Sequence, residues 1–201
     1  MTEIPAADVK KLREMTGAGM MDCKRALEEA DGDFDRAVEI LRQKGLASAA
    51  KRATRSANQG VVESYIHFNN TVGVLVEVNC ETDFVANTED FRRLAKDVAL
   101  HIASAGPVYV SREDVPEELV ESERRIYQAQ AREMGRPEKV LPQIVEGLMQ
   151  KFYEQTVLLD QAFVKDDSKT IRLLLDGVSA KVGEKVAVRR FVRYKLGEDT
   201  A

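Results

Sequence analysis

The spacing of hydrophobic residues divides the chain into two parts. Over residues 1–45 they recur every three to four positions in three short segments, as in amphipathic helices. The expected helices are about Asp8 to Met15, Met20 to Ala30 and Asp33 to Gly45. The first should bury Val9, Leu12 and Met15 on one stripe and end at Gly17. We therefore expect a three-helix domain over residues 1–45.

A linker and a change of period follow. Residues 46–60 are rich in alanine and basic residues with few large apolar groups, which indicates a partly helical linker. From Val61 the period becomes two, and two alternating runs flank the turn pair Asn69-Asn70. This pattern predicts a β-hairpin. Its second strand should bury one face, made by Val72, Val74, Val76 and Val78.

Helical spacing returns after the hairpin. Asn87 or Thr88 can cap a helix that ends near Gly106-Pro107. The residues expected to be buried along it are Phe91, Leu94, Ala95, Val98 and Ile102. "PVYV" (107–110) suggests a short strand, and Ser111 with Asp114 three positions later predicts a capping box.

The remaining residues favour an α+β fold. Two long helical stretches, about Glu117 to Met134 and Glu138 to Gln161, are separated by Gly135-Arg136-Pro137, which is typical of an antiparallel helical hairpin. A last helix, about Lys169 to Val182, leads into an alternating strand that can complete the sheet. We expect an α+β core domain, with an antiparallel sheet and covering helices, over residues 61–197. Residues 198–201 should form a flexible tail.

Composition narrows the class of protein. Hydrophobic residues at 44% and charged residues at 32% are typical of a globular chain, and no apolar run reaches the roughly 20 residues of a spanning helix. The start of the sequence lacks the pattern of a signal peptide, so we expect a cytoplasmic protein without a membrane partner. A net charge of −4 disfavours a specific nucleic-acid binder and favours a protein partner.

Few residues suggest covalent chemistry or a bound cofactor. Cys23 and Cys80 are far apart and lack a C-x-x-C pattern, so neither a disulfide framework nor a metal site is expected. We expect both thiols to be buried or half-buried. His67 and His101 lack the partners of a catalytic triad. Glu81 with Asp83 could form an acid/base pair, but carboxylates near a helix start also complement its dipole.

Two places do not fit simple packing. Met20 and Met21 are adjacent, so on a helix they point about 100° apart and a small core cannot take both. Phe84 follows Asp83 in a connection that should be solvated. Periodicity alone leaves open whether the Phe84 ring packs under the sheet or points outward.

Several motifs together resemble one family. "VKKLREMTGAGMMDCKRALEEADGDFDRAVEILRQKG", "VEVNCETDFVANTEDF", "KDVALHIASAGP", "IVEGLMQKFYEQTVLLDQAFVKDD" and "VGEKVAVRRFVRYKLGE" are similar, in order and spacing, to the signatures of bacterial elongation factor Ts, in a short form with one core module. The resemblance implies a guanine-nucleotide exchange factor for elongation factor Tu, without covalent chemistry. It also implies that residues 1–45 are a ubiquitin-associated-like domain.

The resemblance assigns two sets of site residues. Arg13, Met20 and Met21 match positions that dock on the GTPase domain of Tu. The family's Thr-Asp-Phe-Val motif falls on Thr82, Asp83, Phe84 and Val85, and in relatives it displaces magnesium from Tu. Asp83 could hold the shifted state of Tu by hydrogen bonding or repel its phosphate region, and the sequence does not choose.

Short members of the family form homodimers, which implies a two-plus-two complex with Tu. The last strand and the helical hairpin are the candidate dimer surfaces, and the chain lacks the C-terminal cysteine that crosslinks some relatives. One departure from the family is Ala162, where proline is common. Two other functions remain open: an adaptor that binds a partner without exchanging nucleotide, and, more remotely, an enzyme using Glu81 and Asp83.

Overall fold

The computed structural model describes residues 4–16, 18–134 and 137–198. It has an α+β fold whose segments alternate between two compact units. The first unit comprises residues 1–61, 78–94 and 173–187, and the second comprises residues 62–77, 95–172 and 188–201. The predicted glycine stop at Gly17, the break at Gly135-Arg136 and tail residues 199–201 lie outside the described residues.

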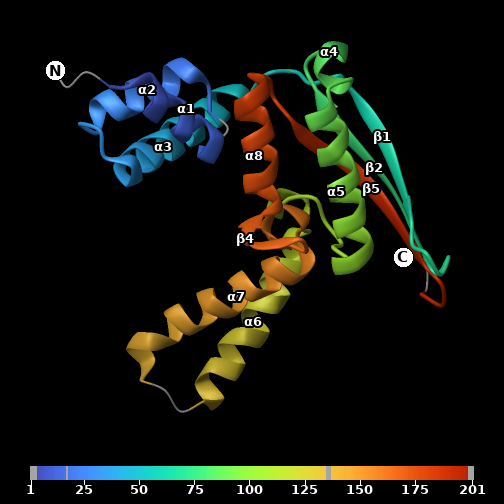
Figure 1. The fold of residues 1–201 in the computed structure, drawn as a ribbon. Helices are drawn as coiled ribbons and strands as arrows, with labels where there is room; N and C mark the ends of the chain where they lie inside the picture. The colour runs from blue at the N-terminus through green and yellow to red at the C-terminus, as the bar shows by residue number, and fades with distance from the viewer. Residues whose placement is uncertain (1–3, 17, 135–136, 199–201) are drawn as a thin grey trace. The chain divides into compact units, whose positions relative to one another are not determined.

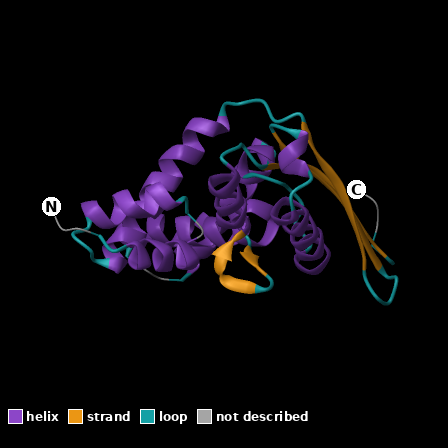
Figure 2. Ribbon diagram, turned by 45° about the horizontal axis from the view of Figure 1, so that its top comes forward, coloured by secondary structure: helices purple, strands orange, loops and turns teal. Residues whose placement is uncertain are grey.

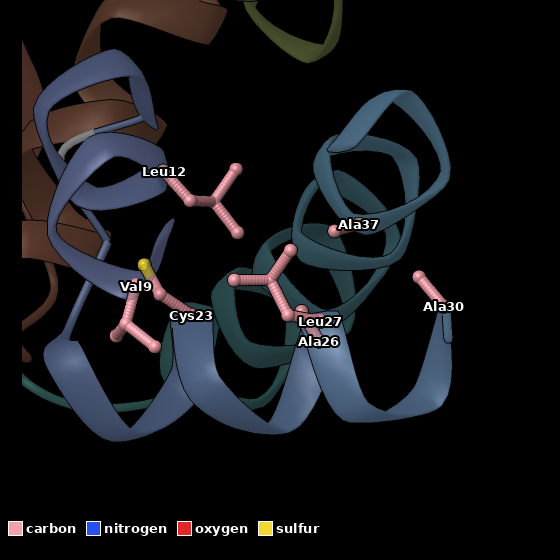
Figure 3. Close-up of a cluster of buried hydrophobic side chains, with 7 residues drawn as sticks. All are labelled: Val9, Leu12, Cys23, Ala26, Leu27, Ala30 and Ala37. Atoms are coloured by element: carbon pink, nitrogen blue, oxygen red, sulfur yellow. The ribbon is translucent and has the colours of Figure 1, made fainter. Parts of the chain in front are cut away.

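The first unit begins with the three predicted helices, α1 (Ala6–Thr16), α2 (Met20–Glu29) and α3 (Phe34–Ala53), drawn in blue in Figure 1. As predicted, Asp33 caps α3, because its Oδ1 accepts from the N–H of Arg36 over 3.1 Å. A small core fills the space between the helices (Figure 3). Its buried members are Val9, Leu12, Cys23, Ala26, Leu27, Ala30 and Ala37.

Two expectations for these helices are wrong. Met15 lies outside the core, with its side chain exposed, because only Val9 and Leu12 of α1 fit into so small a core. Helix α3 does not end at Gly45 but continues to Ala53, through alanine and basic residues that favour a helix more than one glycine opposes it. The helical part of the predicted linker is therefore continuous with the third helix.

A three-stranded antiparallel sheet follows, with β1 (Gln59–Ile66), β2 (Val72–Cys80) and β5 (Ala187–Lys195) in the order β1-β2-β5. Figure 2 shows these long strands in orange. The predicted hairpin closes where the N–H of His67 donates to Val72 O over 2.9 Å. Val74, Val76 and Val78 are buried as predicted, whereas Val72, at the start of the strand, is only half-buried. The final strand completes the sheet, also as predicted.

A one-turn helix, α4 (Asp83–Ala86), precedes α5 (Glu89–Ala105). Thr88 caps α5, because its Oγ1 accepts from the N–H of Phe91 over 3.3 Å. The chain leaves α5 at Gly106, whose φ of 60° suits glycine. All five predicted apolar positions of this helix are buried.

In the second unit, α6 (Glu117–Glu133) and α7 (Leu141–Thr156) lie side by side as the expected helical hairpin (Figure 1). The predicted capping box forms at η1 (Arg112–Asp114), where Ser111 N–H donates to Asp114 Oδ2 over 2.8 Å. Short 3₁₀ turns flank α7, namely η2 (Glu138–Val140) and η3 (Leu158–Asp160). The prediction of one helix from Glu138 to Gln161 is therefore wrong, because Val157 adopts an extended conformation.

Two details near the end of the chain also differ. Instead of a strand over 107–110, Tyr109 forms an isolated bridge with Val157. A second, two-stranded sheet joins β3 (Ala162–Phe163) to β4 (Asp166–Thr170), and only then does α8 (Ile171–Val182) begin. Ala162, the departure from the family, pairs with Thr170 in this sheet. No helix in the described ranges is both long and apolar enough to span a bilayer.

Candidate functional site

The Thr82–Val85 motif forms the first turn of α4. Thr82 is the N-cap residue, and its Oγ1 accepts from the N–H of Val85 over 3.4 Å. An isolated turn of this length has little stability of its own, because helix nucleation is costly. Its conformation therefore depends on the residues that hold its two ends.

Glu184, in the turn between α8 and β5, holds the N-terminal end. Its Oε2 accepts from the backbone N–H groups of Glu81 and Thr82 over 3.1 and 3.0 Å. Its Oε1 accepts from the Thr82 hydroxyl over 2.7 Å. Glu184 thus contacts both the backbone and the capping hydroxyl of the motif.

A second carboxylate makes the reverse connection. Glu81 Oε1 accepts from the N–H of Lys185 over 2.6 Å and from the Arg55 guanidinium over 3.3 Å. The hydrogen bond from the Lys185 N–H is the main cause that lowers the pKa of Glu81, and the Arg55 guanidinium lowers this pKa further. Glu81 is therefore a structural hydrogen-bond acceptor. This role disfavours the acid/base pair of Glu81 with Asp83.

The C-terminal end of α4 is held separately. Arg92 Nε donates to Ala86 O over 3.0 Å, and its second nitrogen donates to Asn87 Oδ1 over 3.1 Å. The Thr88 hydroxyl donates to Val85 O over 2.7 Å. The bonds to Ala86 O and Val85 O thus reach carbonyl groups in the last part of α4 from outside the helix.

The four motif residues divide into supporting and exposed side chains. Val85 is buried and Thr82 is occupied by capping, whereas Asp83 is exposed and the Phe84 side chain is 83% exposed. The alternative that Phe84 packs under the sheet is wrong. Below the motif, the buried Cys80 thiol donates to Thr82 O over 3.1 Å, and burial raises its pKa.

The predicted docking residues lie on the three-helix part of the first unit. Met20 and Met21, in the first turn of α2, are 41% and 62% exposed, so the small core takes neither methionine. Arg13 in the last turn of α1 is exposed as well. Met15, also exposed, adds a third methionine on these two helices. Flexible methionine side chains on a surface suit binding to another protein.

Sequence reasoning missed the residues that hold the motif. Glu184 and Lys185 bond to Glu81 and Thr82 across 102 to 104 positions of sequence, so no local pattern connects them. Only the register that brings the start of β5 beside the end of β2 could have indicated the contact. Across the described residues, no three His, Cys, Asp or Glu side chains are grouped to bind a metal ion.

Comparisons with known proteins give the family. The model of the family described as elongation factor TS matches residues 8–198. The chain is 58% identical to elongation factor Ts of Desulforamulus reducens over 98% of its own length and 91% of the relative's. Identity to elongation factor Ts of Moorella thermoacetica is 57%, covering 97% of this chain and 96% of the relative. Identity to elongation factor Ts of Geobacter sulfurreducens is 54%, covering 97% of this chain and 90% of the relative.

These matches define the class as a translation elongation factor. The chain belongs to the elongation factor Ts family.

Proposed function

We propose that the chain is a guanine-nucleotide exchange factor for elongation factor Tu, which displaces magnesium and promotes GDP release. The observation that carries this proposal is the Phe84 side chain, 83% exposed on a turn whose two ends are both held by hydrogen bonds. An exposed aromatic ring costs free energy in water and gains it when a partner covers it. Membership of the elongation factor Ts family supports Tu as that partner.

The physical basis of exchange is linkage. If this chain binds nucleotide-free Tu more tightly than Tu with GDP, then it weakens GDP binding by the same factor. Phe84, inserted between helices of Tu, would stabilise the shifted conformation through its buried area. Asp83 beside it either accepts hydrogen bonds in that conformation or repels the phosphate and metal region. Neither role makes or breaks a covalent bond.

The three-helix surface has a different part in the proposal. Arg13, Met20 and Met21 bind the GTPase domain of Tu, and this contact raises the local concentration of the Thr82–Val85 motif at the nucleotide site. We assign docking to residues 1–45, connection to residues 46–60 and exchange to the core domain over 61–197. The protein would act in the cytoplasm, where translation occurs.

We also propose that the chain forms a homodimer, giving a two-plus-two complex with Tu. The supporting observation is an apolar face of the three-stranded sheet in the second unit. Its exposed apolar side chains are Val62, Ile66, Leu75, Val192 and Tyr194. A groove of about 300 Å³ crosses this face, lined in part by Val62, Leu75 and Val192. An exposed apolar patch of this kind is typical of an interface. It includes the last strand, one of the two candidates from the sequence.

The deciding experiment is release of fluorescent GDP from Tu. Substoichiometric amounts of the protein should accelerate release with multiple turnovers, because an exchange factor is regenerated at each cycle. If the protein binds Tu but leaves the release rate unchanged, then the adaptor function replaces this proposal. If it neither binds Tu nor changes release, both functions fail for this partner.

A further inference from the structure

Glu184 bonds to the exchange motif from a distant part of the chain. Its carboxylate accepts three hydrogen bonds, from Glu81 N–H, Thr82 N–H and the Thr82 hydroxyl. The same hydroxyl oxygen accepts from Val85 N–H and so caps α4. Glu184 is therefore connected to the turn that carries Phe84 in two ways, through the backbone N–H groups and through the capping hydroxyl of Thr82. We call the bonds between Glu184 and these two residues the Glu184 clamp.

The position of Glu184 is itself determined by the end of α8. Gly183, at φ 76°, makes a turn that an L side chain rarely adopts, and its N–H donates to Ser179 O over 2.9 Å. The Ser179 hydroxyl donates to Glu184 O over 2.6 Å and accepts from Arg52 Nε over 3.2 Å. The backbone that carries the Glu184 side chain is thus held in place by hydrogen bonds to Ser179.

The neighbouring residues reinforce this arrangement in the opposite direction. Glu81 accepts from Lys185 N–H, while Lys185 Nζ donates to Arg55 O over 3.0 Å. Two adjacent pairs, Glu81-Thr82 and Glu184-Lys185, therefore each offer a carboxylate to the other pair's backbone. Charge-assisted hydrogen bonds of this type are the stronger ones in proteins.

Core packing does not set the direction of the Phe84 ring, because that side chain is almost fully exposed. The backbone of α4 must set it, and the Glu184 clamp fixes the start of that backbone. A side chain that is held in its binding geometry before it meets a partner avoids an entropy cost when it binds. We propose that Glu184 is a positioning residue for nucleotide exchange. It acts through Thr82 on Phe84 and Asp83, and this role rests on the proposed exchange function.

The first test is Glu184→Ala in the full chain. The maximal GDP-release rate at saturating protein should fall about tenfold, because the loosened turn must then be ordered when Phe84 inserts into its partner. The half-saturating concentration should change by less than about twofold, because docking through Met20 and Met21 is intact. Glu184→Gln keeps an acceptor oxygen for the two N–H groups and should restore the rate to within about threefold of wild type.

Asp114→Ala is the matched control. Asp114 also accepts from a backbone N–H and a hydroxyl, both of Ser111 over 2.8 Å, at a helix start in the second unit. Its loss should lower stability without changing the maximal release rate. If Asp114→Ala and Glu184→Ala slow release equally at matched folded fractions, Glu184 contributes only general stability and the proposal is overturned.

A double-mutant cycle supplies the decisive readout. If Glu184 acts through Phe84, then adding Glu184→Ala to Phe84→Ala should slow release by less than about twofold beyond Phe84→Ala alone. If the double variant slows GDP release by the full product of the two single effects, the positioning role is overturned.

Amide hydrogen exchange of Thr82 and Val85 in the free protein separates this proposal from the exchange function itself. Glu184→Ala should speed their exchange about tenfold without any Tu present. A loosened turn with an unchanged release rate overturns the positioning role alone. A wild-type protein that does not accelerate GDP release overturns the exchange function, and the positioning role with it, whatever the amides show.

Discussion

Phe84 and Val85 are consecutive residues of one helical turn, yet Phe84 is 83% exposed and Val85 only 9%. Successive helical side chains point about 100° apart, so one turn can place one residue in the core and present the next to a partner. The buried residue fixes the turn from below and the exposed residue forms its tip. This separation predicts opposite consequences for substitutions at the two positions.

Phe84→Ala should impair exchange and leave the fold intact. We expect the maximal rate of GDP release from Tu to fall at least about tenfold, as for loss of one strong interface side chain. Binding to nucleotide-free Tu should weaken as well, because Phe84 would bury its area in that complex. Fluorescent-GDP release and titration of nucleotide-free Tu measure the two effects. Ile126→Ala, which shortens a 45% exposed side chain on α6, is the control and should change neither. Equal release rates for Phe84→Ala and wild type would remove Phe84 from the mechanism.

Val85→Ala should instead destabilise the protein. Removing two buried methyl groups costs about 1.5–2 kcal/mol of unfolding free energy, including part of the cavity left behind. Urea unfolding should show the lower midpoint, whereas Phe84→Ala should unfold at the wild-type midpoint. If both variants unfold at the same urea concentration, the burial difference between the two side chains has no energetic counterpart.

Periodicity predicted the parts of the fold in which a regular element buries one face. The hairpin valines and the apolar stripe of α5 are of this kind, because their spacing reports directly which face is buried. It missed β4, whose sequence "DDSKT" has no apolar alternation and forms a strand only by pairing with β3. It also placed the end of α3 at Gly45, where one unfavourable residue was outweighed by the eight that follow.

The candidate site likewise has one part that the sequence predicted and another that it did not. The family motif identified Thr82 to Val85, and the structure shows Phe84 exposed, a choice that periodicity had left open. The support for the motif could not be predicted, because Glu184 and Glu81 make long-range bonds to backbone groups that carry no signal in the sequence. A carboxylate at either position looks like an ordinary surface residue until the strands are paired.

The methionine surface leads to a prediction about affinity. Replacing Met20 and Met21 together with serine should raise the half-saturating concentration for GDP release about tenfold, because apolar contact area with the partner is lost. The maximal rate and the circular dichroism spectrum should stay unchanged, since both side chains are exposed. Met134→Ser, at a 54% exposed position after α6, is the control and should leave the affinity unaltered. Wild-type affinity in the double variant would show that the two methionines do not contact Tu.

The apolar sheet face predicts how the dimer can be dissociated. Val192→Lys places a charge on the last strand, at the edge of the groove, and should reduce the mass measured by light scattering from two chains to one. Ile126→Lys tests the helical hairpin, the other candidate surface, and should leave the mass unchanged. If Ile126→Lys dissociates the dimer and Val192→Lys does not, the hairpin is the interface. A monomeric wild-type protein would contradict the dimer altogether.

Stability should depend on pH through His101. This fully buried ring contacts Gln161 Oε1 through Nε2 over 3.0 Å, and Val164 N–H donates to its Nδ1 over 3.3 Å, which together assign a neutral ring with the proton on Nε2. Burial lowers the pKa of His101, and the bond to Gln161 offsets this only in part.

The sign of the effect follows from proton binding. Below about pH 6.5 the unfolded chain protonates this histidine while the folded chain does not, so stability should fall as the pH decreases toward the lowered folded pKa. Urea unfolding at a series of pH values between 7.5 and about 5 should show this slope. His101→Gln should lower stability at pH 7.5 but flatten the slope, whereas His67→Gln, which removes the other histidine, should retain it. An unchanged slope in His101→Gln would assign the pH dependence to other groups.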